Sequence, residues 1–387
     1  MNFVFLSPHF PPNYYQFCVH LRQLGANVLG IADASFETLR PELKSALTEY
    51  YRVSDMHSYD ELLRALGYFT SRYGKLDRLD SQNEYWLEIE GRLRTDFNIF
   101  GLRTSDLPKI KQKSEMKRVF NKAGINTARG MIAHDLQTAR HFIEEVGYPV
   151  IAKPDIGVGA NMTYKIKSDK DLKRFFAEKP SDDYFMEEFI EGTIVTFDGL
   201  TDRTGKPVFI SSMEYCGGIM EAVNEDTDFY YYTVRKIPSD LVKAGKKTLH
   251  AFGVRERFFH FEFFRKPDES LVGLEVNIRP PGGLTMDMFN YANDIDMYRE
   301  WANVVVNNHF EAHYSRPYYC GYIGRKTNKR YVLSHEQVLT RYADYLIHHQ
   351  PIEGVFSAAL GNYGYLVRSP DLDEVIQISH EVLEKLP

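Results

Sequence analysis

The stretch LEVNIRPPGG, residues 274–283, combines a strand pattern with an unusual set of polar side chains. Glu275, Asn277 and Arg279 alternate with Val276 and Ile278, so in a strand the polar side chains share one face and the apolar ones the other. The Pro-Pro-Gly-Gly run then ends the strand. Two oxygen ligands beside a fixed guanidinium suit a hard divalent cation next to a phosphate or carboxylate.

The preceding residues predict the partner of this strand. In FFHFEFFRKPDESLVGLEVNIR, residues 258–279, Pro-Asp-Glu-Ser separates two β-prone runs, which is typical of a hairpin. If Asp268 and Glu269 form the turn, Glu262 lies opposite Glu275 with Cβ atoms about 5 Å apart. Two negative charges directly opposite each other are destabilising unless a cation bridges them. The alternative is that both glutamates face solvent. A different turn would also shift the pairing by one residue.

Two lysines upstream extend the pattern. Lys153 ends the apolar strand YPVIAK, directly before the loop DIGVGANM. In that loop, Gly157 and Gly159 allow backbone N–H groups to turn toward phosphate oxygens. Lys113 lies within a basic helical stretch expected over Lys109 to Ala123. For each lysine the ordinary alternative is a charge in solvent. His260 would pair with Asn277 in the hairpin register above, and its ordinary alternative is a packed strand residue.

The order of strands and helices predicts mixed α/β architecture. Residues 1–100 alternate strand and helix signals, which implies a parallel sheet covered by helices, with residues 97–101 expected at a strand of that sheet. A small α+β unit follows from residue 105. Longer strands over residues 194–278 predict an antiparallel sheet, and residues 284–308 predict one helix. The loop SQNEYW, with Asn83 and Glu84, is a candidate to line a cleft.

Composition excludes several classes of protein. The chain has 387 residues with 47 basic and 53 acidic side chains, a net charge of −6, which argues against nucleic acid as a partner. Cys18, Cys216 and Cys320 have no paired spacing, so neither a disulfide framework nor a zinc site is expected. No apolar run reaches about 18 residues and no signal peptide is apparent, so we expect a cytoplasmic protein with no membrane span.

In this order and spacing, the motifs resemble the ATP-grasp superfamily, which includes D-alanine–D-alanine ligase, biotin carboxylase and the L-amino-acid ligases. The resemblance covers most of the chain and is firmest over residues 113–283. It implies an ATP-grasp fold with an N-terminal Rossmann-like (preATP-grasp) parallel-sheet domain, a small α+β lid and a larger antiparallel-sheet core. The units expected are residues 1–104 for the N-terminal domain, 105–126 for a linker helix, 127–188 for the lid, 189–310 for the core and 311–387 for a C-terminal α/β segment packed on the core.

The same resemblance implies roles for individual residues, each at a position where a family motif matches. ATP phosphates would contact Lys113, Lys153, Gly157 and Gly159, and the adenine would meet the hinge YFMEEFIEG at Glu187, Glu188, Phe189 and Ile190. Glu262, Glu275 and Asn277 would hold Mg²⁺ or Mn²⁺, with two ions expected. Arg279 and Lys153 would be catalytic, and Arg279, Gly282 and Gly283 would bind substrate. Apart from the resemblance, Arg235 in YTVRKIP is a candidate to face phosphate or substrate, with a charge at the sheet edge as the alternative.

One position departs from the family pattern. The family often writes E-G-x-E after the hinge, and the last Glu holds the ribose hydroxyls. Here Ile194 stands at that position, so Glu191 or another residue takes the ribose, or the nucleotide is held less tightly.

The implied reaction is ADP-forming ligation of a small-molecule carboxylate and an amine through an acylphosphate, with an amino acid as one substrate. Homodimers are common among the relatives. Two alternatives stand beside this reading. One is carboxyphosphate chemistry of the biotin-carboxylase or carbamoyl-phosphate-synthase type. The other is a regulatory protein that binds ATP without catalysis.

Overall fold

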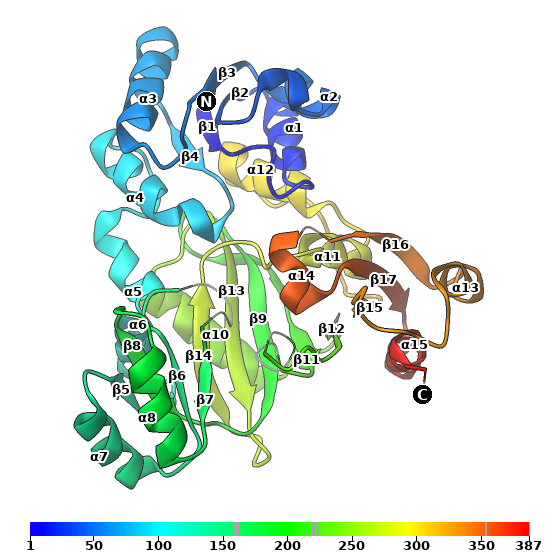
Figure 1. Cartoon of the computed structure of the whole chain (residues 1–387). Helices are drawn as coiled ribbons and strands as arrows, with labels where there is room; N and C mark the ends of the chain where they lie inside the picture. The colour runs from blue at the N-terminus through cyan, green and yellow to red at the C-terminus, as the bar shows by residue number, and fades with distance from the viewer. Residues whose placement is uncertain (158–161, 219–221, 223, 353, 387) are drawn as a thin grey trace.

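The computed structural model describes residues 1–157, 162–218, 222, 224–352 and 354–386. Three sheets with their helices surround a central hollow. The N-terminal unit lies at the top of Figure 1, a small unit at the lower left and the C-terminal segment at the right. The predicted mixture of one parallel sheet with antiparallel sheets is confirmed.

The N-terminal sheet is parallel, and helices connect its strands, as the alternation of signals predicts. Its strand order is β3-β2-β1-β4. The strands are β1 (Asn2–Leu6), β2 (Asn27–Ala32), β3 (Glu49–Arg52) and β4 (Arg78–Asp80), and the main helices are α1 (Tyr15–Gln23), α2 (Pro41–Ala46), α3 (Tyr59–Tyr73) and α4 (Leu87–Asp96). Because β2 and β4 lie on opposite sides of β1, the loops after β1 and β4 flank the place at the carboxyl edge of the sheet where such folds have a ligand-binding crevice.

The strand expected at residues 97–101 is wrong. This segment forms the turn that ends α4, with Asn98 at a φ of +50° and Gly101 at +130°. The Ile99 N–H donates to the Arg94 carbonyl at 2.9 Å. Gly101 packs against Arg94, where a Cβ atom would come within 3.0 Å of the arginine side chain. The apolar residues therefore pack at the C-terminal end of α4 and do not form a further strand of the sheet.

The basic helical stretch is broken in two, where one helix was expected. α5 (Leu107–Lys111) ends at Gln112, whose extended backbone forms a bridge with Ile156, and α6 (Lys113–Lys122) starts at the next residue. Lys113 therefore lies in the first turn of α6. Its N–H donates to the Asp155 carbonyl at 2.9 Å, which ties α6 to the glycine-containing loop.

The small α+β unit is a sheet of order β5-β8-β6-β7 covered by two helices. Its elements are β5 (Gly130–Ile132), α7 (Leu136–Val146), β6 (Val150–Pro154), β7 (Tyr164–Ile166), α8 (Asp169–Glu178) and β8 (Tyr184–Glu188). Asp135 and Ser168 cap the two helices with their side-chain oxygens, as their sequence positions favour. β6 pairs with β8, so Lys153 lies opposite Phe185 and Ile151 opposite Glu187.

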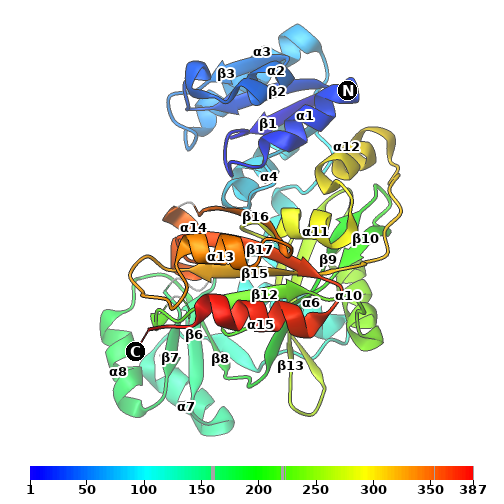
Figure 2. The same ribbon diagram turned by 90° about the vertical axis from the view of Figure 1, so that its right-hand side faces the viewer.

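The central sheet is antiparallel and runs β14-β13-β9-β11-β12-β15-β17-β16, with β10 paired to β9. Its strands are β9 (Thr193–Thr201), β10 (Pro207–Ser211), β11 (Met213–Cys216), β12 (Phe229–Thr233), β13 (Phe258–Arg265), β14 (Leu271–Asn277), β15 (Tyr319–Arg325), β16 (Leu346–Pro351) and β17 (Tyr363–Ser369). The C-terminal strands thus continue the same sheet, as Figure 2 shows, with α13 (His335–Arg341), α14 (Gly354–Leu360) and α15 (Leu372–Leu383) around them.

Alternation along β13 separates the core from the site. Phe259, Phe261 and Phe263 pack with α6 and α10 (Ser239–Phe252), behind the sheet in the view of Figure 1. Successive strand residues point to opposite faces, so His260 and Glu262 face the hollow.

The hairpin between β13 and β14 has the predicted pairing but a different turn. Glu262 lies opposite Glu275 and His260 opposite Asn277, while Arg265 pairs with Leu271. The loop therefore spans one residue fewer than a turn centred on Asp268 and Glu269 allows. An irregularity after Glu262 inserts Leu274 as an unpaired residue and restores the register. Such bulges commonly lie beside active sites.

The helix expected over residues 284–308 is two helices. α11 (Thr285–Asn293) ends at Asp294, whose φ is +52°, and α12 (Met297–Asn307) begins after Asp296. The Asp296 side chain accepts from the N–H groups of Tyr298 and Arg299, which caps the second helix. The chain therefore bends at Asp294, after the helix that follows the PPGG motif.

A buried charge network joins the N-terminal sheet to the central sheet. Arg257 lies 2.5 Å from Asp80, and Arg94 lies 3.3 Å from Asp80 and 2.6 Å from Glu90. All four side chains are buried. Arg94 also donates to the Leu79 carbonyl. Across the described ranges, no helix has the length and apolar character that crossing a membrane requires.

Candidate active site

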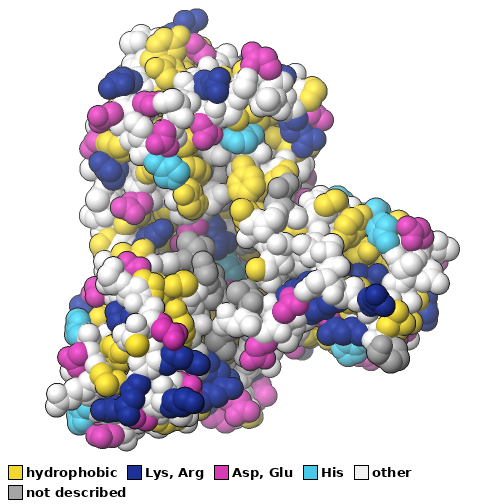
Figure 3. Space-filling view, in the orientation of Figure 1, with side chains coloured by type: hydrophobic (Ala, Val, Ile, Leu, Met, Phe, Trp, Pro, Cys, Tyr) yellow, Lys and Arg dark blue, Asp and Glu magenta, His cyan; other side chains and the backbone are white. Residues whose placement is uncertain are grey.

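The strongest candidate site is a cavity of about 430 Å³ between the small unit and the central sheet. It opens into the hollow that Figure 3 shows where the parts of the molecule meet. Lys113, Lys153, Glu187, Glu188, Phe189, Ile190, Glu191, Ile194, Glu262 and Glu275 are among the residues that line it. The structure thus brings together residues from α6, β6, β8, β9, β13 and β14 that the sequence assigns to one site.

A buried cluster of two lysines and a glutamate forms one wall of the cavity. Lys153 Nζ lies 2.5 Å from Glu187 Oε1, and Lys117 Nζ lies 3.2 Å from Glu187 Oε2. Burial alone would raise the pKa of Glu187, but the two lysines outweigh it and lower that pKa to about 2. Burial lowers the pKa of Lys117, whereas for Lys153 the glutamates overcome burial and raise it. The carboxylate of Glu187 is thus engaged by both lysines.

Lys113 supplies a further positive charge at the same cavity. Its Nζ donates to the Gly157 carbonyl at 3.2 Å, and it is 6% exposed. Burial lowers its pKa, and Glu275 opposes that effect. Asp155 fixes the start of α6 by accepting from the Ser114 N–H and hydroxyl at 2.8 and 2.9 Å. The lysine therefore points from a rigid helix start toward the glycine-containing loop.

Glu262, Glu275 and Asn277 form an oxygen-rich face on the hairpin. Burial and the neighbouring Glu262 raise the pKa of Glu275. In the part of the chain that the structure describes, no three His, Cys, Asp or Glu side chains converge as a metal site by themselves. Two carboxylates and an amide oxygen fit a cation such as Mg²⁺, which usually takes one or two protein carboxylates and completes its shell with water and phosphate oxygens.

His260 contacts the carboxylate of Glu262, one of these three residues. Its Nε2 lies 3.0 Å from Glu262 Oε1, and its Nδ1 lies 2.6 Å from Asp198 Oδ1. Burial would lower the pKa of His260, but Asp198 and Glu262 raise it to about 9. The ring is thus a cation that donates to both carboxylates.

Arg279 lies at the end of the hairpin, where the N-terminal unit meets it. Its Nε lies 3.1 Å from Glu84 Oε2, and its NH1 group donates to the Pro280 carbonyl at 2.9 Å. Burial would lower the pKa of Arg279, but Glu84 raises it. The Asn83 side chain accepts from the Tyr85 N–H and thereby caps the short helix that carries Glu84. A carboxylate from one domain thus orients the guanidinium of another.

The Pro-Pro-Gly-Gly run after Arg279 allows its backbone to lie close to neighbouring groups. Gly283 has a φ of +64°, and a Cβ atom there would lie 2.6 Å from Leu360. The Thr285 hydroxyl donates to the Gly282 carbonyl at 2.8 Å, and Gly282 is exposed. These contacts hold the turn between Arg279 and α11.

Three predicted residues need comment. Arg235 does not reach the cavity, because its guanidinium donates to the carbonyls of Arg316 and Pro370 at 3.0 and 2.7 Å. Its predicted contact with substrate stays a prediction. Glu188 lines the cavity but pairs with Arg129 on the surface at 2.6 Å. Gly159 lies outside the described residues.

Sequence reasoning missed Lys117. It stands one helical turn after Lys113, so the two side chains share a face of α6. That spacing was the available signal. Its burial and its contacts with the carbonyls of Gly273 and Leu274 at 3.0 and 3.2 Å depend on packing against β14.

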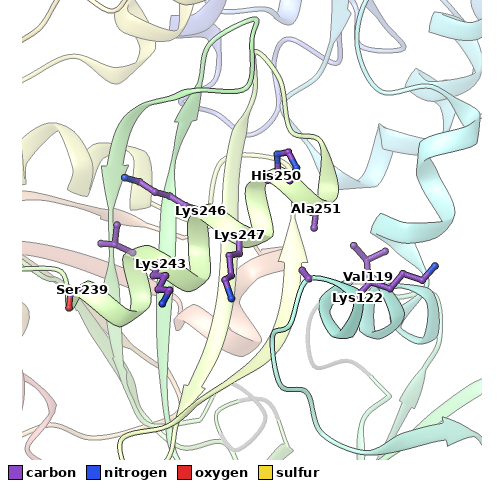
Figure 4. A pocket seen from close by; sticks show the side chains of 10 residues that line it. Val119, Lys122, Ser239, Lys243, Lys246, Lys247, His250 and Ala251 are labelled. Carbon is purple, nitrogen blue, oxygen red and sulfur yellow. The ribbon is translucent and has the colours of Figure 1, made fainter.

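A larger hollow of about 900 Å³ lies elsewhere, between α6 and α10 (Figure 4). Lys122, Lys243, Lys246, Lys247 and His250 surround an apolar floor that includes Val119 and Ala251. Among its described lining residues no carboxylate is present, so it has no metal-binding set.

Comparison with known proteins identifies one domain. Residues 146–287 match the family model described as the ATP-grasp domain, and this range holds Lys153, the hinge, the hairpin and Arg279. The carbamoyl phosphate synthase large chain of Methanothermobacter thermautotrophicus is 29% identical over 196 residues. These cover 47% of this chain but only 18% of that protein. This chain therefore corresponds to a small part of that relative.

Solved structures share the fold over nearly the whole chain. The L-amino acid ligase from Bacillus licheniformis has a TM-score of 0.74 and 14% identity, with 98% of this chain and 96% of that one covered. The N5-carboxyaminoimidazole synthetase from Staphylococcus aureus, complexed with ADP, has a TM-score of 0.71 and 13% identity, with 99% and 97% covered. At these identities the likeness establishes the ATP-grasp fold.

Proposed function

We propose that this chain, which has the ATP-grasp fold, is an ATP-dependent, ADP-forming carboxylate–amine ligase that works through an acylphosphate. One observation carries the proposal. Lys113, Lys153, Glu262 and Glu275 line one cavity, and Arg279 follows two residues after Asn277 and pairs with Glu84 of the N-terminal unit. Phosphoryl transfer to an anion needs this concentration of positive charge.

The lysines would bind and orient the phosphates of ATP. Lys113 stands at the start of α6, and its carbonyl contact at Gly157 is replaceable by a phosphate oxygen. Glu262, Glu275 and Asn277 would hold Mg²⁺, which when bound screens the charge between nucleotide and acid. The hinge at Phe189 and Ile190 would contact the adenine, and Ile194 lines the cavity where the family often has a ribose-binding Glu.

Arg279 would clamp the substrate carboxylate while it attacks the γ-phosphate. A carboxylate oxygen would form a bond to the γ-phosphorus while the bond from that phosphorus to the β–γ bridging oxygen breaks. The products of this step are the acylphosphate and ADP. An amine then attacks the acyl carbon and releases phosphate. The fixed Glu84 contact keeps the guanidinium aimed at the crevice, and backbone N–H groups at Gly282 and Gly283 would support the carboxylate.

We propose an amino acid as one substrate, which the shared fold with an L-amino acid ligase supports. The proposed units keep their ranges: residues 1–104 contribute the crevice, 105–126 the linker helix, 127–188 the lid, 189–310 the metal and catalytic strands, and 311–387 the wall beyond α11. Closure of the lid would exclude water from the acylphosphate.

A second candidate is carboxyphosphate chemistry, in which bicarbonate takes the place of the carboxylate. The identity with carbamoyl phosphate synthase favours it. Both candidates use the same phosphate and metal machinery, and they differ only in the acid that Arg279 receives.

The test is ADP release from MgATP with pooled amino acids, hydroxy acids, small carboxylates and bicarbonate, each with and without amines, followed by mass spectrometry. Carboxylates labelled with ¹⁸O would transfer one label to phosphate if an acylphosphate forms. Release that requires an acid and an amine, with label transfer, supports the ligase. Release with bicarbonate alone supports the second candidate. ATP binding without release from any pool contradicts both and favours a regulatory nucleotide-binding protein.

A further inference from the structure

The hollow between α6 and α10, here named the basic groove, has no part in the proposed reaction (Figure 4). Its floor is apolar and half-buried, and consists of Val119, Ala123, Val242 and Ala251. Its rim is basic and exposed, and consists of Lys122, Lys243, Lys246, Lys247 and His250. Ser239 completes the described lining, which therefore contains no carboxylate, arginine or aromatic ring.

The basic groove lies on the face of the central sheet opposite the catalytic cavity. α10 packs closely onto that face at Gly245, where a Cβ atom would lie 2.1 Å from the Phe197 ring. Phe120 of α6 contacts Phe252 of α10, with ring centroids 5.4 Å apart. Both helices are thus fixed by the core behind them, and a ligand in the groove would leave the catalytic cavity open.

The lysines of the rim lack the anionic partners that other side chains of the same helices have. α6 and α10 contain one carboxylate each. Glu115 of α6 pairs with Arg118 at 2.8 Å, and Asp240 of α10 pairs with Arg265 at 2.8 Å. Within the described ranges, none of the four lysines of the rim forms an ion pair or a side-chain hydrogen bond. The rim is thus positive charge that the chain does not neutralise, in a protein of net charge −6.

The placement of these lysines disfavours the helix that carries them. Lys243 lies three residues before Lys246 and four before Lys247, so like charges are neighbours on one face of α10. Cations in the last turn of a helix interact favourably with its dipole, which accounts for Lys122 in α6 and His250 in α10. The three lysines of α10 precede the last turn and lack this compensation. An anionic partner would offset their repulsion.

The kinds of side chain in the groove indicate which anion it fits. Nucleic acids are commonly bound by arginine, which contacts phosphates in pairs, and by aromatic rings that stack on bases. The described lining has neither. Lysine is a compact, hydrated charge on a flexible stem, which suits carboxylates held at the edge of a contact. The apolar floor requires an apolar face on the same ligand. An acidic amphipathic helix presents both, because its apolar stripe is flanked by carboxylates.

We propose that the basic groove is a docking site for an acidic amphipathic helix of a partner protein. The apolar stripe of that helix would cover the floor, and its aspartates and glutamates would contact the lysines of the rim. Surface ion pairs are weak and screened by salt, so the contact is a transient one. The inference does not depend on the proposed ligation.

The test measures the binding of defined peptides to the full chain by fluorescence anisotropy. The probe is a fluorescein-labelled peptide of about 18 residues made of glutamate, alanine and leucine, with the leucines along one helical face. One control peptide has lysine in place of every glutamate, and a second has glutamine in place of every leucine. We expect the probe to bind and the lysine peptide not to bind. The glutamine peptide should bind at least about tenfold more weakly, since it cannot cover the apolar floor.

A pair of charge reversals locates the binding site. Lys243→Glu combined with Lys246→Glu should weaken probe binding at least about tenfold and should allow the lysine peptide to bind, because like charges across an interface repel. The matched control is Lys170→Glu combined with Lys173→Glu, an exposed pair with the same spacing and the same change of net charge on α8. It should leave the Kd of the probe within about twofold of wild type. Lys113→Met, in the catalytic cavity, should leave it unchanged as well.

Four outcomes would overturn the proposal. Equal losses in the two double variants would show that net charge alone governs binding. A loss in Lys113→Met without a loss in the α10 variant would place the peptide in the catalytic cavity. Tighter binding of a single-stranded oligonucleotide, with the same dependence on Lys243 and Lys246, would make the groove a nucleic-acid site. The absence of probe binding at an ionic strength of about 0.01 M, where charges are least screened, would show that the groove does not take an acidic helix.

Discussion

Replacing Glu187 with glutamine tests the electrostatics of the candidate site most directly. The carboxylate is 4% exposed, and its two oxygens contact Lys153 and Lys117 at 2.5 and 3.2 Å. Glutamine keeps the shape and removes the charge. Two buried ammonium groups would then share one neutral amide, and of the two, within the described part of the chain, only Lys117 also donates to backbone carbonyls.

The size of the effect follows from the pKa of Glu187. A change from 4.5 in the unfolded chain to about 2 corresponds to about 3 kcal/mol, at 1.36 kcal/mol per pKa unit. Because the folded-state pKa is the lower one, this stabilisation is fully present above pH 4.5 and is lost as the pH falls through about 2. At pH 8 the variant should therefore lose about 3 kcal/mol, in line with other broken buried ion pairs.

Hydrogen exchange measured by mass spectrometry is the appropriate assay, since a protein of several units does not unfold in one step. Amides of β6 and β8 should exchange about 100-fold faster in Glu187→Gln. The matched control is Glu188→Gln, because its partner Arg129 is 60% exposed in its side chain and such surface pairs contribute less than about 1 kcal/mol. If amides of β6 and β8 exchange at similar rates in both variants, the ion pairs of Glu187 do not contribute the expected stabilisation of about 3 kcal/mol.

The other predictions concern the reaction and its ligands. Arg279→Ala should abolish ligation while calorimetry shows unchanged MgADP binding; residual turnover above about 1% would exclude the clamp role. Lys113→Met should weaken MgADP binding at least tenfold, whereas Lys122→Met, at the far end of α6, should not. Equal effects would show that the net positive charge of α6 matters more than the position of Lys113. His260→Phe should lower Mn²⁺ affinity 10–100-fold in calorimetry, as loss of a contact behind a metal ligand usually does, and unchanged affinity would leave His260 as a packing residue. Glu84→Gln should raise the KM for the acid while MgADP binding stays constant; a change only in nucleotide binding would refute its role beside Arg279.

The fold class was predictable because its signals are local. Alternating strand and helix patterns gave the parallel N-terminal sheet, and β-prone runs gave the antiparallel one. The pairing of Glu262 with Glu275 was also predictable, although for a partly wrong reason. A shorter loop and the extra residue Leu274 offset each other, and neither leaves a clear sign in the sequence.

Breaks within helices were less predictable. Gln112 interrupts a stretch of good helix formers because its backbone pairs with Ile156, forty-four residues later in the chain. Residues 97–101 have apolar side chains suited to a strand, but Gly101 packs against Arg94 and the segment turns. In the first case a tertiary contact outweighs local propensity, and in the second a contact with the end of the preceding helix does.

The parts of the site that depend on distant contacts could not be predicted from a single sequence. Glu84 reaches Arg279 across 195 positions. The motif positions on β6 and the hairpin were predictable, because strand alternation defines them. The contribution of the N-terminal unit required the three-dimensional structure.

The buried network of Asp80, Glu90, Arg94 and Arg257 has a consequence for chimeric proteins. A recombinant that takes its first domain from a relative with an apolar residue at position 80 would remove the 2.5 Å partner of the buried Arg257 and leave Glu90, 3.9 Å away, as its remaining anion. Breaking a buried ion pair costs about 3–5 kcal/mol. Positions 80, 90, 94 and 257 therefore need to be exchanged together. The first domain is thus not an interchangeable module, and libraries that shuffle it should treat these four positions as one inherited unit.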